Sequence, residues 1–197
     1  MKLWTILVCL LLCGCGGAQL QALSSDDVIV AFGDSLTAGK GVSQEHAYPA
    51  ILSEITGKKV VNAGVSGETT TEGLERIATV LDDEAPALLI LFEGGNDILR
   101  NLDLTKTESN LDAMIVLAKE RGIQIALVGL PRKQLFSSTA QFYSDLAESH
   151  DLPIEDEIVA SLLRQPNMKS DSVHFNRTGY RALAQAIANM LKEAGAL

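Results

Sequence analysis

The chain alternates short apolar runs with segments in which apolar residues recur at helical spacing. Four runs are almost continuously apolar, which is typical of parallel strands buried on both faces of a sheet. A fifth, shorter run contains Pro153, which cannot donate a ladder hydrogen bond and therefore favours a sheet edge or a loop. The predicted strands are residues 28–32, 59–62, 87–92, 123–128 and 152–154.

Three amphipathic helices are predicted between and after these strands. Thr69 with Glu72, and Thr105 with Glu108, have the capping-box spacing that marks the start of a helix. An apolar stripe follows each of them, and a third stripe closes the chain. Strands and helices in alternation predict a three-layer α/β/α sandwich with right-handed crossovers. The stripes are Leu74, Ile77, Ala78 and Leu81, then Leu111, Met114, Ile115 and Ala118, and finally Tyr180, Leu183, Ile187 and Leu191.

The first residues resemble an export signal. Lys2 adds positive charge to the amino terminus, and residues 3–12 form an apolar stretch too short to span a bilayer. The stretch ends in Leu12-Cys13-Gly14-Cys15, which resembles the bacterial lipobox, whose last cysteine is lipidated and becomes the mature amino terminus. Cys15 is therefore the predicted lipidation site.

This reading divides the chain into a signal peptide over residues 1–14, a linker over 15–26 and a folded domain over 27–197. The alternative is a secretory signal cleaved after Ala18, which leaves a soluble exported protein. Both readings predict export. The lipobox version gives a periplasm-facing lipoprotein held at a membrane by its acyl chains, and the glycine after the lipidated cysteine favours the outer membrane over the inner one.

Composition excludes several classes of protein. The 197 residues suffice for one domain of ordinary size. The net charge of −9, with basic runs no longer than pairs such as Lys58-Lys59, argues against a nucleic-acid partner. All three cysteines, Cys9, Cys13 and Cys15, precede the folded domain, so that domain has no disulfide and no cysteine-based metal site. The oligomeric state leaves no signature in the sequence.

Small and polar residues follow the predicted strands. Residues 33–37 read GDSLT, residues 64–69 read GVSGET and residues 94–97 read GGND, and Asp171 and His174 stand just before the last helix. Ligands of open parallel sheets bind beyond the carboxyl ends of the strands. We therefore expect these four segments to form one site.

The four segments, in this order, resemble the blocks of the SGNH (GDSL) hydrolase family, and most of all its small bacterial arylesterase, acyl thioesterase and lysophospholipase group. The resemblance covers nearly all of the predicted domain. It implies a flavodoxin-like parallel sheet of about five strands in the order 2-1-3-4-5 and the hydrolysis of carboxylic esters, thioesters or lysophospholipids without a cofactor. No HExxH or EF-hand spacing indicates a metal.

A serine nucleophile needs a base within hydrogen-bond reach and a third group that orients the base. Ser35 is the predicted nucleophile and His174 the base, because Asp171 three residues earlier can reach its imidazole. His46 and His150 are predicted to be surface residues, His150 close enough to a helix end to satisfy its last carbonyls.

The family pattern further implies an oxyanion hole made by the backbone N–H groups of Ser35 and Gly67 and the side-chain amide of Asn96. Asp34 is expected to organise its loop, and Asp97 to start a helix. The loop after the fourth strand combines apolar side chains with two cations and is the predicted wall for the acyl chain. Its predicted substrate-binding residues are Leu130, Pro131, Leu135 and Phe136.

Two positions depart from the family pattern. Glu93 stands where related enzymes carry an apolar or neutral residue, and it is expected either beside the pocket or in solvent. Phe175 replaces a common proline. Two other functions remain open: a polysaccharide or cell-wall O-deacetylase of the same superfamily, disfavoured because the only tryptophan, Trp4, lies in the signal, and an acyl-binding lipoprotein without catalysis.

Overall fold

A five-stranded parallel sheet forms the centre of the computed structural model, which describes residues 18–132 and 138–197. Its strand order, β2-β1-β3-β4-β5, confirms the order that the family resemblance implied. The predicted lipidation site Cys15 and the predicted acyl-wall residues Leu135 and Phe136 lie outside the described residues. The strands are β1 (Val28–Gly33), β2 (Lys59–Gly64), β3 (Leu88–Phe92), β4 (Gln124–Val128) and β5 (Ile154–Glu155).

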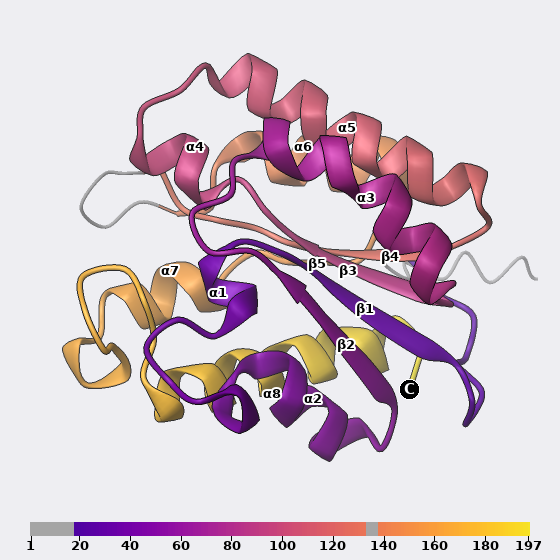
Figure 1. Ribbon diagram of the computed structural model, residues 1–197, viewed down its shortest axis with the longest axis horizontal. Coiled ribbons are helices and arrows are strands. Elements are labelled where there is room, and N and C mark those ends of the chain that lie inside the picture. The colour runs from indigo at the N-terminus through magenta and orange to yellow at the C-terminus, as the bar shows by residue number, and fades with distance from the viewer. Residues whose placement is uncertain (1–17, 133–137) are drawn as a thin grey trace, which may run out of the picture.

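Helices cover both faces of the sheet and make the predicted three layers (Figure 1). One face carries α3 (Thr70–Glu84), α5 (Leu104–Glu120) and α6 (Gln141–His150). The other carries α2 (Tyr48–Thr56), α7 (Ile158–Leu163) and α8 (Arg177–Glu193). The remaining short helices are α1 (Ser35–Ala38), α4 (Gly95–Leu99), η1 (Gln44–His46) and η2 (Pro166–Met168).

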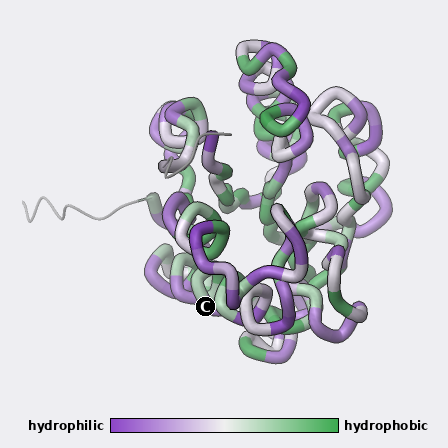
Figure 2. The backbone as a smooth tube through the Cα atoms, turned by 90° about the vertical axis from the view of Figure 1, so that its left-hand side faces the viewer, coloured by the Kyte–Doolittle hydropathy of each residue, from purple (hydrophilic) through white to green (hydrophobic). Residues whose placement is uncertain are grey.

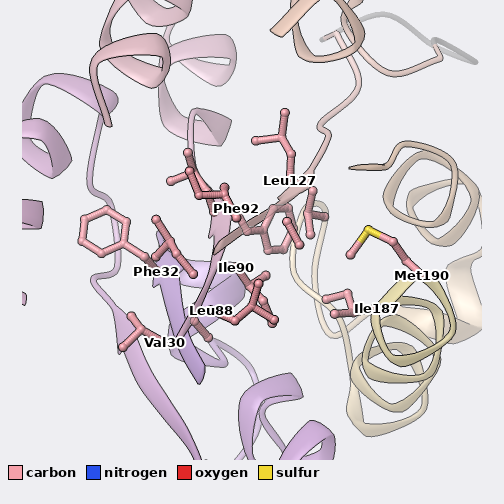
Figure 3. Packing of buried hydrophobic residues seen from close by; sticks show 14 of the residues in the cluster. Val30, Phe32, Leu88, Ile90, Phe92, Leu127, Ile187 and Met190 are labelled. Atoms are coloured by element: carbon pink, nitrogen blue, oxygen red, sulfur yellow. The ribbon is translucent and has the colours of Figure 1, made fainter. Parts of the chain in front are cut away.

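The core lies between the sheet and its two helical layers. Every residue of β3 is buried, as the unbroken apolar run predicted. Figure 3 shows side chains on both sides of the sheet: Phe32 of β1 points to one side, whereas Ile90 of β3 lies on the side of Ile187 of α8. Figure 2 shows hydrophobic and hydrophilic residues alternating around the helices, as expected for helices with one buried face. Phe32, Ile90, Leu127 and Ile187 are fully buried, and the burial of each side chain stabilises the fold by roughly 1.5–3 kcal/mol.

One of the two predicted helix starts is confirmed. The capping box before α3 is present, with the N–H of Thr69 donating to Glu72 Oε2 at 2.8 Å. The second prediction is wrong, because Asp103 caps α5 by accepting the N–H of Thr105 at 3.0 Å. The Asp103 carboxylate takes the cap position, so Thr105 is already inside the helix.

The two ends of the sheet have different neighbours. Helices α1, α4 and α7 gather at the left-hand end in Figure 1, where the strands terminate. Residues 20–23, part of the expected linker, run beside the last residues of the chain instead: the N–H groups of Leu20 and Leu23 donate to the carbonyls of Ala194 and Ala196 at 2.7 and 2.9 Å. Among the described helices, none has the length and apolar character needed to cross a membrane.

Candidate active site

Ser35 lies at the first turn after β1. Asp34 caps α1 by accepting the N–H of Leu36 at 2.9 Å, so Ser35 is the first helical residue. Gly33 is required here because a Cβ would come within 2.0 Å of the Phe92 carbonyl oxygen on the neighbouring strand. The tight strand-to-helix turn presents the Ser35 side chain beyond the sheet edge. The prediction that Asp34 organises this loop is confirmed.

The structure brings Ser35, His174 and Asp171 into one hydrogen-bonded chain. His174 Nε2 lies 2.9 Å from Ser35 Oγ, and its Nδ1 lies 2.7 Å from Asp171 Oδ2. The other carboxylate oxygen, Asp171 Oδ1, accepts the N–H groups of Val173 and His174, both at 2.9 Å. These bonds, that from Val173 foremost, lower the pKa of Asp171 to about 2, so the carboxylate stays charged beside the imidazole.

The neighbours of His174 hold its backbone in place. Phe175, at the position where proline is common, is fully buried and packs edge-on against Tyr180, with ring centroids 5.6 Å apart. His150 lies at a helix end as predicted, being the last residue of α6, but its side chain bonds to Asp112 instead of the last carbonyls of that helix. Its Nε2 lies 2.7 Å from Asp112 on α5, so it joins α6 to α5 by a side-chain pair that the local sequence could not reveal.

Two predicted oxyanion donors point away from other acceptors. Within the described residues, the backbone N–H groups of Ser35 and Gly67 donate to no protein atom. Gly67 has φ of +86°, a conformation that other residues rarely adopt. The two N–H groups are therefore available to a ligand that lies against Ser35.

The third predicted donor, Asn96, is already engaged. Its Nδ2 lies 2.8 Å from the carbonyl oxygen of Glu68 and 3.2 Å from Asp34 Oδ2. Both amide protons thus have protein acceptors, the contact with Asp34 being the longer. These bonds hold the amide in place, and Asn96 and Ser35 line one pocket.

Three further groups secure the Gly67 turn, and sequence reasoning missed all of them. Arg100 donates from Nη2 to the carbonyl oxygen of Gly67 at 2.7 Å. Arg76 forms a two-pronged pair with the buried carboxylate of Glu68, with both N–O distances 2.6 Å. The Arg76 guanidinium also lies 3.9 Å from the centre of the Phe32 ring. The capping and motif rules used on the sequence are local, whereas these partners come from different helices.

Buried acids lie beneath the site. Burial raises the pKa of Asp34 to about 6. Glu93 is also fully buried, which corrects the expectation of a pocket or solvent position; its Oε1 accepts the N–H of Gly94 at 3.1 Å, and its Oε2 has no partner among the described residues. Burial, and then the charge of Asp34, raises the pKa of Glu93 well above its ordinary value and so favours its neutral form.

Asp97 has a different role from the one predicted. It lies inside α4 and accepts the N–H of Thr70 at 2.9 Å and the Thr70 hydroxyl at 2.6 Å. Asp97 therefore caps α3, the helix that follows the Gly67 turn. It ties the Gly67 turn to the turn that carries Asn96.

A pocket of about 720 Å³ opens over Ser35 and His174. The predicted wall residues Leu130 and Pro131 line it, together with apolar side chains from α4 and α7. Within the described residues, no three His, Cys, Asp or Glu side chains are placed to hold a metal ion. The apolar lining residues of α4 and α7 are Ile98, Leu99, Ala160 and Leu163.

Comparison with known proteins agrees with this geometry. Residues 31–182 match the model of the GDSL-like lipase/acylhydrolase family. The chain is 30% identical over 174 residues to the thioesterase 1/protease 1/lysophospholipase L1 of Escherichia coli K12, covering 84% of each protein. It is 28% identical over 196 residues to an arylesterase of Vibrio mimicus, covering 94% of this chain and 96% of the relative.

A solved structure supports the same assignment. AlinE4, described as an esterase of the SGNH-hydrolase family, superposes with a TM-score of 0.67 at 33% identity, covering 89% of this chain and 100% of AlinE4. The relatives are carboxylic ester hydrolases by name, in accord with the activity predicted from the sequence. The chain belongs to the GDSL-like lipase/acylhydrolase family.

Proposed function

We propose that this protein is a serine esterase that cleaves acyl esters through Ser35, His174 and Asp171. The observation that carries the proposal is the unbroken hydrogen-bonded chain from Asp171 through His174 to Ser35 at the mouth of an apolar pocket. His174 Nε2 accepts the Ser35 proton as Oγ attacks the carbonyl carbon. Asp171, charged and bonded to Nδ1, orients the imidazole and stabilises the imidazolium that forms.

Negative charge then develops on the substrate carbonyl oxygen. The free N–H groups of Ser35 and Gly67 meet it first, since both are preorganised and have no protein acceptor to give up. Asn96 donates a third hydrogen bond to this oxygen. It uses the amide proton that points toward Asp34, because that contact is longer than the one to Glu68. Collapse of this intermediate passes the proton from His174 to the leaving group and yields an acyl-enzyme, which water hydrolyses by the same steps in reverse.

The acyl chain lies along the apolar lining of the pocket, between α4 and the loop after β4. The named activities of the relatives suggest aryl esters, acyl thioesters and lysophospholipids as substrates. Measuring kcat/KM for substrates of these three classes, with acyl chains of graded length, ranks the classes by preference. Leu135 and Phe136 remain predicted wall residues.

Ser35→Ala tests the proposal. Removal of the nucleophile lowers kcat toward every ester by at least about a thousandfold, and a fluorophosphonate probe labels the wild type but not the variant. Ser66→Ala, in the nearby turn, serves as the control and retains labelling. A wild type that resists the probe, or a Ser35→Ala protein that keeps its activity, refutes the proposal and favours a non-catalytic acyl-binding role.

We further propose that the protein is exported and tethered through Cys15. The hydrogen bond from Leu20 to Ala194 supports a particular orientation, because Ala194 caps the far end of α8, whose first residue follows His174 by only three positions. At 1.5 Å per residue, this helix separates the tether from His174 by about 25 Å. The pocket then faces away from the membrane. Cys15→Ser is expected to release the protein into the soluble fraction.

A further inference from the structure

The pocket lining is cationic, although the protein is acidic. Arg132, Arg164 and Lys169 line it, and Asp34 is the only acidic residue among the lining residues described. Asp34 is 3% exposed and its two carboxylate oxygens already accept hydrogen bonds from Leu36 and Asn96, so it is not placed to pair with these cations. Against a net charge of −9, this is a local excess of positive charge beside the nucleophile.

Arg164 and Lys169 have side chains without partners in the described structure. Neither forms a side-chain hydrogen bond or an ion pair with a described residue. Other arginines on the surface are engaged, as Arg121 with Asp82 and Arg181 with Glu54. The two cations are thus available to an anion that enters the pocket.

The backbone gives these two cations fixed places. Arg164 is the C-cap residue directly after α7, and Lys169 is the C-cap residue directly after η2. Lys169 also pairs with Phe175 in an antiparallel bridge, one residue beyond His174. The bridge places the Lys169 backbone beside the segment that carries His174.

The chemistry assigns a side of the pocket to the leaving group. His174 must hand its proton to the departing oxygen or sulfur, so that atom lies next to Nε2. The group attached to that atom extends over the segments beside His174, where Lys169 lies, and into the part of the pocket that Arg164 also lines. The guanidinium of Arg164 and the ammonium of Lys169 can both donate hydrogen bonds to phosphate oxygens. The two side chains therefore suit a leaving group that carries a phosphate.

We propose that Arg164 and Lys169 form a leaving-group subsite, and that the preferred substrates of this esterase are acyl esters or thioesters whose leaving group carries a phosphate. The proposal rests on the serine esterase function proposed above. A lysophospholipid headgroup and the phosphates of an acyl-coenzyme A share this chemistry.

Two matched pairs of octanoyl substrates separate phosphate recognition from acyl recognition. The ester pair is octanoylglycerol and octanoylglycerol 3-phosphate; the thioester pair is S-octanoyl-N-acetylcysteamine and octanoyl-coenzyme A. The variants are Arg164→Gln, Lys169→Gln and their double variant. Lys192→Gln, an exposed lysine at the far end of α8, is the matched control.

In the double variant, we expect kcat/KM for the phosphate-bearing substrates to fall about tenfold, since each exposed charge pair accounts for up to about fivefold. Neutral substrates change by less than about twofold, because they carry no phosphate for either cation to bind, and about 0.5 M NaCl reduces the difference between the paired substrates in the wild type. Lys192→Gln leaves all four rates unchanged. The expected loss arises mainly in KM.

A loss confined to the ester pair assigns the subsite to a lipid headgroup, and a loss confined to the thioester pair assigns it to coenzyme A. Unchanged rates with both phosphate-bearing substrates, or equal losses with all four substrates, overturn the subsite. Activity on the neutral esters in these variants also shows that the fold is intact. If the esterase proposal itself is wrong, Ser35→Ala leaves the hydrolysis of neutral esters unaffected. That result separates a failure of the esterase proposal from a failure of the subsite.

Discussion

Replacing Asp34 by asparagine is expected to stabilise the protein at alkaline pH while impairing catalysis. The Asp34 carboxyl is 3% exposed and has a pKa of about 6, raised first by burial. An asparagine oxygen can still cap α1 by accepting the N–H of Leu36. Its amide, however, faces the amide of Asn96, where one donor meets another.

The magnitude follows from proton linkage. A carboxyl whose pKa is 3.8 when unfolded and about 6 when folded keeps its proton longer in the folded state, so stability falls as pH rises between these values. The charged Asp34 therefore costs about 3 kcal/mol at pH 8 and less than about 1 kcal/mol at pH 4. Asparagine removes this dependence. The opposed amides cost about 1 kcal/mol at every pH.

Urea unfolding at pH 4 and pH 8 measures the effect. The change in unfolding free energy on Asp34→Asn should be more favourable at pH 8 than at pH 4 by about 2–3 kcal/mol. Asp103→Asn, the same change at an exposed helix cap, should show no such difference. A change in Asp34→Asn that is identical at the two pH values would refute the reasoning. At pH 8, kcat should fall about tenfold, because Asn96 loses one of the two acceptors that orient its amide.

Two other substitutions test the surroundings of the oxyanion hole. Arg100→Leu removes the only side-chain bond to the Gly67 carbonyl among the described residues and should lower kcat about tenfold with KM little changed, partly rescued in Arg100→Lys; Arg121→Leu is its control. Glu93→Gln replaces a buried acid whose pKa is raised, so ionisation of Glu93 costs stability as pH rises, and the substitution should raise Tm more at pH 8 than at pH 5; an equal shift at both pH values contradicts the buried-acid interpretation.

The strands and the Asp171–His174 pair could be predicted because their signals are local, whereas Ser35, 139 residues before His174, could be paired with it only through the family resemblance. A continuous apolar run reports burial directly, and the sequence located all five strands within two residues. The strands extend further than predicted at Gly33 and Gly64, since glycine adds no hydrophobic signal. Gly64 is needed for space: a Cβ there would lie 2.2 Å from the backbone nitrogen of Ala38. The spacing of Asp171 and His174 was equally local.

The supporting interactions could not be predicted because they join distant parts of the chain. Asp97 was expected to serve its own helix, but it caps Thr70, which lies 27 residues earlier. Glu93 looked like a pocket or surface residue because its burial depends on how α6 packs: Tyr143 donates its hydroxyl to the Glu93 carbonyl at 2.8 Å. Helix-cap and periodicity rules describe neighbours along the chain and contain no information on such partners.

The buried acids show how the site trades stability for rigidity. Asp34 holds Asn96, Asp97 holds the start of α3, and Glu68 anchors Arg76 beside the Gly67 turn. Each carboxylate loses hydration on burial, and only Glu68 has a cation in direct contact among the described residues. An apolar cluster of similar volume would be more stable but could not orient an amide or a backbone N–H toward a developing charge. The tenfold loss of kcat expected without the Asp34 acceptor corresponds to about 1.4 kcal/mol of transition-state stabilisation, so at pH 8 the site gives up roughly 3 kcal/mol of stability for a smaller gain in the positioning of one donor.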